Sequence, residues 1–71
     1  MTFITFILVA SMSQNAFAQS TKKERNLITA GNELYDNGRY KAALIKYQEA
    51  LKENPNSAVA KYNLGLSQIM I

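Results

Sequence analysis

Three observations predict an all-α protein. Apolar residues after residue 24 recur at intervals of three and four, which is the spacing of one face of a helix. Helix-start and helix-stop signals divide this part of the chain into three segments. Gly31 and Gly65 lie 34 residues apart, a separation that indicates a repeated helical unit.

Length and composition limit how much core these helices can form. The 71 residues suffice for one small domain, and short chains bury little apolar surface to offset the entropy lost on folding. The chain has no cysteine and no histidine, so it forms no disulfide and is a poor candidate for a structural zinc site. Oligomerisation, or further protein beyond residue 71, is therefore expected to add stability.

An uncharged segment, residues 1–18, precedes the helices and is expected to be a secretory signal peptide. Residues 3–10 read FITFILVA, an apolar run typical of such signals and too short to span a bilayer, which needs about 20 residues. Ala16-Phe17-Ala18 provides the small-x-small pattern of a cleavage site, and cleavage there leaves Gln19 as the first residue. The chain is therefore expected to be secreted across the inner membrane into the periplasm or cell envelope.

No Lys or Arg precedes the apolar run, which departs from the usual signal. The alternative is a membrane-anchored or membrane-active amphipathic helical peptide that retains residues 1–18. An uncleaved signal segment is the only membrane contact that we expect. The two interpretations differ in the mature N-terminus, which is Gln19 in the first and Met1 in the second.

The first helix is expected directly after Thr21. The run from Thr21 to Glu24 fits a capping box, in which the hydroxyl and the carboxylate each accept an exposed backbone N–H. Asp36-Asn37-Gly38 ends this helix, and although Asn-Gly also occurs in β-hairpins, the flanking residues lack the alternation of strands. The apolar face expected for the helix consists of Leu27, Ile28, Gly31, Leu34 and Tyr35.

Two further helices are expected after Gly38. Pro55 stops the second, because the residue before a proline is pushed out of the α region. Asn56 or Ser57 is expected to cap the third. The second helix carries a narrow apolar stripe with small residues, which let helices approach closely: Tyr40, Ala43, Leu44, Tyr47, Ala50 and Leu51. The third carries Ala58, Tyr62, Leu64, Gly65 and Ile69.

These helices and their 34-residue spacing resemble the tetratricopeptide repeat (TPR), a hairpin of two antiparallel helices. Residues 22–57 resemble one repeat, and residues 58–71 resemble the first helix of a second, truncated repeat. The resemblance implies an α-solenoid fragment that serves as a non-catalytic scaffold for protein–protein interaction. The chain departs from the common form at Leu27, Ala30, Leu34, Lys61 and Gln68. The positions that match the structural pattern are Gly31, Gly38, Tyr40, Ala43, Tyr47, Ala50, Pro55, Leu64 and Gly65.

By the same resemblance, the first helices of successive repeats line a concave groove that receives an extended peptide or a partner helix. Tyrosine offers a large contact area at low entropic cost, and asparagine can pair with a peptide backbone. Several of these residues could instead pack against a missing neighbour. Tyr40 and Tyr47 are expected in the core, and Gly31 and Gly65 at close helix contacts. The residues expected to face the groove are Ile28, Asn32, Tyr35, Tyr62, Asn63, Leu66 and Ile69.

A narrower resemblance concerns the run ERNLITAGNELYDNGRYKAALIKYQEALKENPNSAVAKYNLG after a secreted start. It is similar to the TPR proteins encoded in bacterial aerotolerance (Bat) operons. The resemblance implies an envelope-exposed scaffold in a complex with integrin-like metal-binding domain proteins.

Neither an enzyme nor a cofactor is expected. Glu33 with Asp36, and Glu49 with Glu53, each share a helix face, but catalytic carboxylates need a cleft that shifts their pKa values. The single glycines carry no phosphate-binding motif. Capping and solvation explain the serines that lie near lysines, Ser20 with Lys22 and Ser57 with Lys61, better than catalysis does.

No nucleic-acid partner is expected either. The net charge is +3, and the eight basic residues are spread between Lys22 and Lys61 with acids among them. A nucleic-acid surface usually carries a clustered basic stripe.

The chain ends at Ile71 inside an apolar helical run. Terminal repeats of solenoids usually present a polar outer face, because one side of each repeat is otherwise unpaired. We expect a fragment of a longer array, with a truncated reading frame or an obligate assembly as alternatives.

Overall fold

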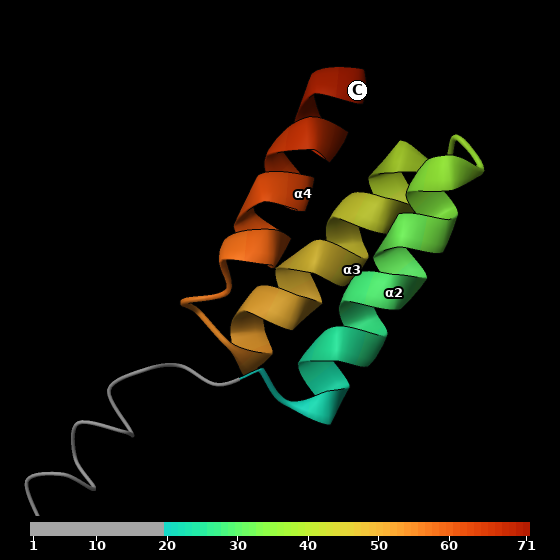
Figure 1. Ribbon diagram of the computed structural model, residues 1–71. Coiled ribbons are helices and arrows are strands. Elements are labelled where there is room, and N and C mark those ends of the chain that lie inside the picture. Colours follow the sequence, from blue (N-terminus) through green and yellow to red (C-terminus); the bar gives the residue numbers. More distant parts are fainter. Residues whose placement is uncertain (1–19) are drawn as a thin grey trace, which may run out of the picture.

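The computed structural model describes residues 20–71, and these residues form three helices (Figure 1). They are α2 (Lys22–Asp36), α3 (Tyr40–Glu53) and α4 (Ala58–Met70). Consecutive helices run in opposite directions and α3 lies between the other two, so that α2 and α4 touch each other only slightly. The all-α prediction is confirmed over this range, which contains no strand. The proposed signal segment, with Ala16, Ala18 and Gln19, lies outside the described residues.

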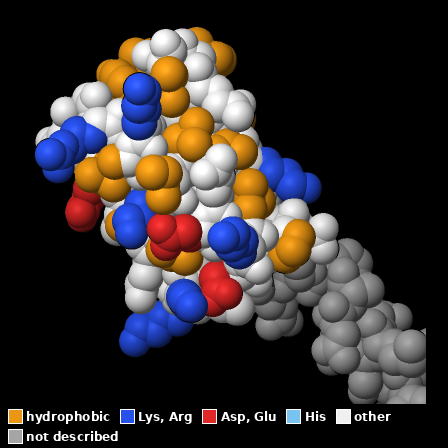
Figure 2. Space-filling model, turned by 180° about the vertical axis from the view of Figure 1, so that it is seen from behind, with side chains coloured by type: hydrophobic (Ala, Val, Ile, Leu, Met, Phe, Trp, Pro, Cys, Tyr) orange, Lys and Arg blue, Asp and Glu red, His pale blue; other side chains and the backbone are white. Residues whose placement is uncertain are grey.

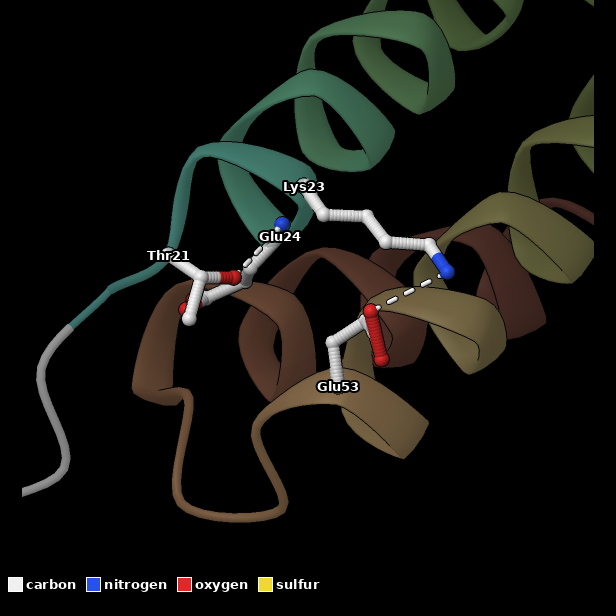
Figure 3. A network of polar contacts seen from close by, with 4 residues as sticks. All are labelled: Thr21, Lys23, Glu24 and Glu53. Atoms are coloured by element: carbon white, nitrogen blue, oxygen red, sulfur yellow. Dashed lines mark hydrogen bonds and ion pairs between the residues drawn. The ribbon is translucent and has the colours of Figure 1, made fainter.

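Local capping explains where α2 begins and ends. The Thr21 hydroxyl accepts the backbone N–H of Glu24 at 3.0 Å, as the capping box requires (Figure 3). At the other end, Gly38 has a φ of 78°, a left-handed conformation that glycine adopts without strain. The backbone N–H of Gly38 then donates to Tyr35 and that of Arg39 to Leu34, at 2.9 and 2.8 Å, which closes a Schellman motif. Asn37-Gly38 therefore ends a helix and does not form a hairpin turn.

The boundary between α3 and α4 follows the sequence signals as well. α3 ends at Glu53, two residues before Pro55, and its C-cap Asn54 has left the helical region. Ser57, one of the two predicted caps of α4, accepts the backbone N–H of Ala60 through its hydroxyl at 3.2 Å. The side chains at the start of each helix thus satisfy backbone donors that would otherwise be unpaired.

The packing between the helices relies on small residues. Ala43 and Ala50 of α3 and Ala60 of α4 are completely buried, and Ser67 of α4 is also fully enclosed. The one large apolar side chain in this buried set is Tyr47, which is 1 % exposed. Because alanine and serine project little beyond the backbone, α3 can approach both neighbours closely.

Gly31 is the position that lets α3 approach α2. A Cβ atom added there would lie 2.5 Å from Cε1 of Tyr47 and 2.9 Å from Cδ1 and Cζ of the same ring. The ring therefore rests directly on the backbone of α2. The predicted close contact at Gly31 is confirmed.

Two packing expectations differ from the structure. Gly65 makes no close helix contact within residues 20–71, because an added Cβ would meet nothing within 4 Å. Tyr40 is only half-buried: its ring packs edge-on against Tyr35, with centroids 5.0 Å apart and planes at 72°. Tyr40 opens α3 beside the turn, where no third helix covers it.

A buried polar cluster ties the start of α2 to the α3–α4 loop. Glu24 is 3 % exposed, and its Oε1 accepts a hydrogen bond from Nδ2 of Asn54 at 3.0 Å. The pKa of Glu24 is lowered, chiefly by this amide and then by the Ser57 hydroxyl, with smaller contributions from the Thr21 backbone N–H and from Arg25. These donors outweigh burial, which acts in the opposite direction. The sequence pattern anticipated the local cap but not this long-range partner.

An ion pair links the same ends of α2 and α3 at the surface. Nζ of Lys23 lies 3.2 Å from Oε1 of Glu53 (Figure 3). The Lys23 side chain is 73 % exposed, so solvent screens the pair and it adds little to stability. The buried Glu24 cluster, rather than this pair, fixes the position of α2 against the loop.

Substitution of Gly31 tests the contact with Tyr47. Gly31→Ala should lower the free energy of unfolding by about 1–3 kcal/mol, because the added methyl overlaps the ring and forces the helices apart. Thr29→Ala, at an exposed position of the same helix, is the matched control and should change stability by less than about 0.5 kcal/mol. Urea unfolding followed by circular dichroism measures both, and equal stabilities of Gly31→Ala and the wild type would contradict the packing described.

Acid titration tests the Glu24 cluster. Because the pKa of Glu24 is lower in the folded protein, ionised Glu24 stabilises the fold above its unfolded pKa, near the model value of 4.5. This contribution should disappear as the pH falls from that value through the lower folded pKa. Glu24→Gln should therefore be less stable than the wild type at neutral pH and show a flatter loss of stability in acid. The exposed Glu33→Gln should retain the wild-type profile, and an unchanged profile for Glu24→Gln would refute the assignment.

Candidate partner-binding groove

A groove opens on the side of the molecule where α2 and α4 flank α3. Its volume is about 240 Å³. α3 contributes the floor through Tyr47, and the two walls come from helices that barely touch each other. The lining residues are Asn32, Tyr35 and Asp36 of α2, Tyr47 of α3, and Asn63 and Leu66 of α4.

A hydrogen-bond triad crosses the groove and fixes the amide of Asn32. The Tyr47 hydroxyl donates to Oδ1 of Asn32 at 2.6 Å, and Nδ2 of Asn63 donates to the same oxygen at 3.1 Å. All three helices are thus joined at a single acceptor. With Oδ1 held by two donors, the NH₂ group of Asn32 is turned away from them and is free to donate to a ligand carbonyl.

Tyr47 keeps its proton over a wide pH range. Burial is the main cause that raises its pKa, and the negative charge of Asp36 and the nearby Tyr35 act in the same direction. The hydroxyl therefore remains a neutral donor to Asn32 well into the alkaline range, and the orientation of the Asn32 amide does not depend on physiological pH changes.

The groove carries little charge. Asp36 is its one ionisable carboxylate, and no Lys or Arg is among the six lining residues. The remaining lining groups are two amides, two phenol rings and one leucine. Such a surface suits an uncharged polypeptide segment, whose backbone amides can pair with asparagine while apolar side chains rest on Tyr35 and Leu66.

The structure brings four of the six predicted groove residues together: Asn32, Tyr35, Asn63 and Leu66. Ile28 lies instead in a separate, shallower depression of about 340 Å³ between the start of α2 and Val59. Tyr62 is 69 % exposed and does not line the groove, and Ile69 is 79 % exposed. These residues point outward because α4 is rotated so that Asn63 and Leu66, not Tyr62 and Ile69, face α2.

Sequence reasoning missed two groove residues. Asp36 was assigned to the turn that ends the first helix, and Tyr47 was assigned only to the core. A usable signal existed for Tyr47, because the hydroxyl of a buried tyrosine usually finds a hydrogen-bond partner. Two amide side chains on the helices predicted to flank α3 were candidates for that partner.

The residues considered for chemistry serve structural roles. Glu49 lies 3.7 Å from Lys46, and Glu53 is paired with Lys23. Ser57 caps α4, and the Ser20 hydroxyl accepts a hydrogen bond from Nη1 of Arg25 at 2.9 Å. Within residues 20–71, no group of three or more His, Cys, Asp and Glu side chains is placed to hold a metal ion.

The surface charge is dispersed. Figure 2 shows Lys and Arg side chains scattered among hydrophobic ones, with Asp and Glu side chains between them, and not gathered into one stripe. None of the three described helices combines the length and the apolar character needed to cross a bilayer.

Comparison with known proteins identifies the repeat. A family model described as TPR repeat matches residues 31–70, which is more than half of the chain. No curated protein and no solved structure gives a significant match. TPR repeats generally mediate protein–protein interaction and act as scaffolds without catalytic activity. The family match and the stacked antiparallel helices together show that this chain belongs to the TPR repeat family.

Proposed function

We propose that this protein is a non-catalytic interaction module that binds an extended, uncharged peptide segment of a partner protein in the groove between α2 and α4. The observation that carries the proposal is the fixed orientation of the Asn32 amide by Tyr47 and Asn63. A donor that is already oriented loses less side-chain entropy when a ligand binds.

The chemistry of the walls defines the ligand further. The NH₂ group of Asn32 donates to a backbone carbonyl, and the Tyr35 ring, held by its edge contact with Tyr40, offers a rigid apolar surface. Leu66 provides the facing apolar contact on α4. A segment with a small apolar side chain next to a free backbone carbonyl satisfies all three groups, whereas an acidic segment is disfavoured by Asp36.

We further propose that the module acts outside the inner membrane, in the periplasm or cell envelope. Support comes from the uncharged residues 1–18 with their apolar run and small-x-small pattern. The mass of the protein recovered from cells tests this proposal. A chain beginning at Gln19 agrees with export and cleavage, whereas an intact Met1 favours a membrane-anchored or membrane-active helical peptide.

The resemblance to TPR proteins of bacterial aerotolerance operons suggests a class of partner. We propose an integrin-like metal-binding domain protein, whose exposed chain segment would occupy the groove. The support is the sequence from Glu24 to Gly65 alone, so the class of partner is a separate proposal from the groove itself.

The groove is tested with peptides selected on the protein from a random library. Asn32→Ala should weaken binding of a selected peptide about tenfold, because the oriented donor is lost, and Asn63→Ala should weaken it less. Gln48→Ala, at an exposed position of α3 that does not line the groove, is the control and should bind as the wild type does. Calorimetric titration measures the affinities.

If Asn32→Ala and Gln48→Ala bind every selected peptide as tightly as the wild type, the groove is not the binding site. Circular dichroism of each variant separates a lost contact from a lost fold. A titration with an integrin-like metal-binding domain in place of the peptide tests the partner class, and its failure would leave the peptide result standing.

A further inference from the structure

The side of α4 that faces away from α3 carries a continuous apolar stripe. Val59, Tyr62 and Ile69 are 56 %, 69 % and 79 % exposed, and half-buried Leu66 lies between the last two. The four positions are separated by steps of three, four and three residues, which is the spacing of a helix that packs lengthwise against another helix. The opposite side of α4, with Ala60 and Ser67, is already buried.

Gly65 gives this stripe a hollow. A Cβ added at Gly65 would meet nothing within 4 Å, whereas one added at Gly31 would overlap the ring of Tyr47. An exposed helical glycine costs stability and gains nothing unless something approaches its backbone closely. The hollow lies in the middle of the stripe, between Tyr62 and Ile69.

The stripe is almost free of charge, which limits what can cover it. Lys61 is the single charged residue of α4, and it lies on the flank of the stripe. A charged partner surface would lose its hydration here without gaining an opposite charge. The covering surface must therefore be apolar and nearly uncharged, and the stripe itself has this character.

We propose that a second copy of this chain covers the stripe, with the two α4 helices packed antiparallel in a symmetric homodimer. An antiparallel pair centred between Gly65 and Leu66 places Tyr62 opposite Ile69 of the second copy, and Leu66 over the hollow at Gly65. It keeps the two Lys61 side chains apart and opposes the helix dipoles favourably. The contact uses the same patch twice, so it closes at two copies.

The distribution of apolar side chains favours this assembly. Within residues 20–71 the buried apolar core consists of three alanines and Tyr47, whereas the large exposed apolar side chains, apart from Ile45, all lie on α4 or directly after it. Pairing of α4 converts this exposed surface into core, which so small a domain needs. The proposal does not depend on the groove function, because the oriented amide of Asn32 lies on α2.

Sedimentation equilibrium of the protein recovered from cells, over a series of concentrations, tests the dimer. The wild type should reach the mass of two chains, and Tyr62→Lys and Ile69→Lys should each weaken association at least about tenfold, because a charge enters the apolar contact. Ile45→Lys, which adds the same charge at an exposed apolar position of α3, should leave association unchanged.

Gly65→Ala provides a variant that cannot fail for lack of folding, since alanine fits the open site and favours helix. It should retain its helical circular dichroism and yet associate several-fold more weakly, because the hollow is filled. Cysteine cross-linking tests the orientation: a mixture of Tyr62→Cys and Ile69→Cys chains should form mixed disulfides, and either variant alone should form few. The absence of cysteine from the chain makes this assignment clean.

A monomer at every concentration would overturn the proposal. So would equal weakening by Ile45→Lys and Tyr62→Lys, full association of Gly65→Ala, or cross-links that form equally well within one variant.

Discussion

The contact between Tyr47 and the backbone of α2 at Gly31 is the interaction on which the rest of the structure depends. The ring fills the space that a side chain would otherwise take, with an ideal Cβ position only 2.5 Å from its Cε1 atom. This contact sets the distance between α2 and α3. It also brings the Tyr47 hydroxyl to Asn32, the next residue of α2, at 2.6 Å.

Packing and candidate function are therefore coupled through one side chain. The ring of Tyr47 belongs to the core, and its hydroxyl belongs to the groove. Asn63 adds the third helix to the same hydrogen-bond triad, so a shift of either α2 or α4 would disturb the orientation of the Asn32 amide. At the other end of the bundle, the buried Glu24 and Asn54 hold α2 to the α3–α4 loop and restrict such shifts. Rigidity at both ends is what a preoriented donor requires.

Most of the helical framework could be predicted from the sequence. Thr21, Gly38, Pro55 and Ser57 act through contacts within a few residues along the chain, so their effects on helix ends follow from local chemistry. The family resemblance placed Gly31 at a close contact. Gly65 fits the same pattern, but it has no neighbour within the described residues, because its contact depends on what packs on the outer side of α4.

The groove could be predicted only in part, because its members depend on how each helix is rotated about its axis. The spacing of apolar residues places Asn63 and Tyr62 almost equally well, and only the packing of Ala60 and Ser67 against α3 decides that Asn63 faces inward. The bond between Glu24 and Asn54 joins residues that are 30 positions apart, and no local pattern specifies it. Pairings of this kind arise from the tertiary arrangement and not from helix propensity.

The mobility of the Asn32 side-chain amide, measured by ¹⁵N relaxation, tests the coupling between core and groove most directly. The wild type should show an amide about as rigid as the helix backbone, and Tyr47→Phe, which keeps the ring and removes the hydroxyl, should loosen it while the helical content is retained. An Asn32 amide that is equally mobile in both proteins would contradict the account.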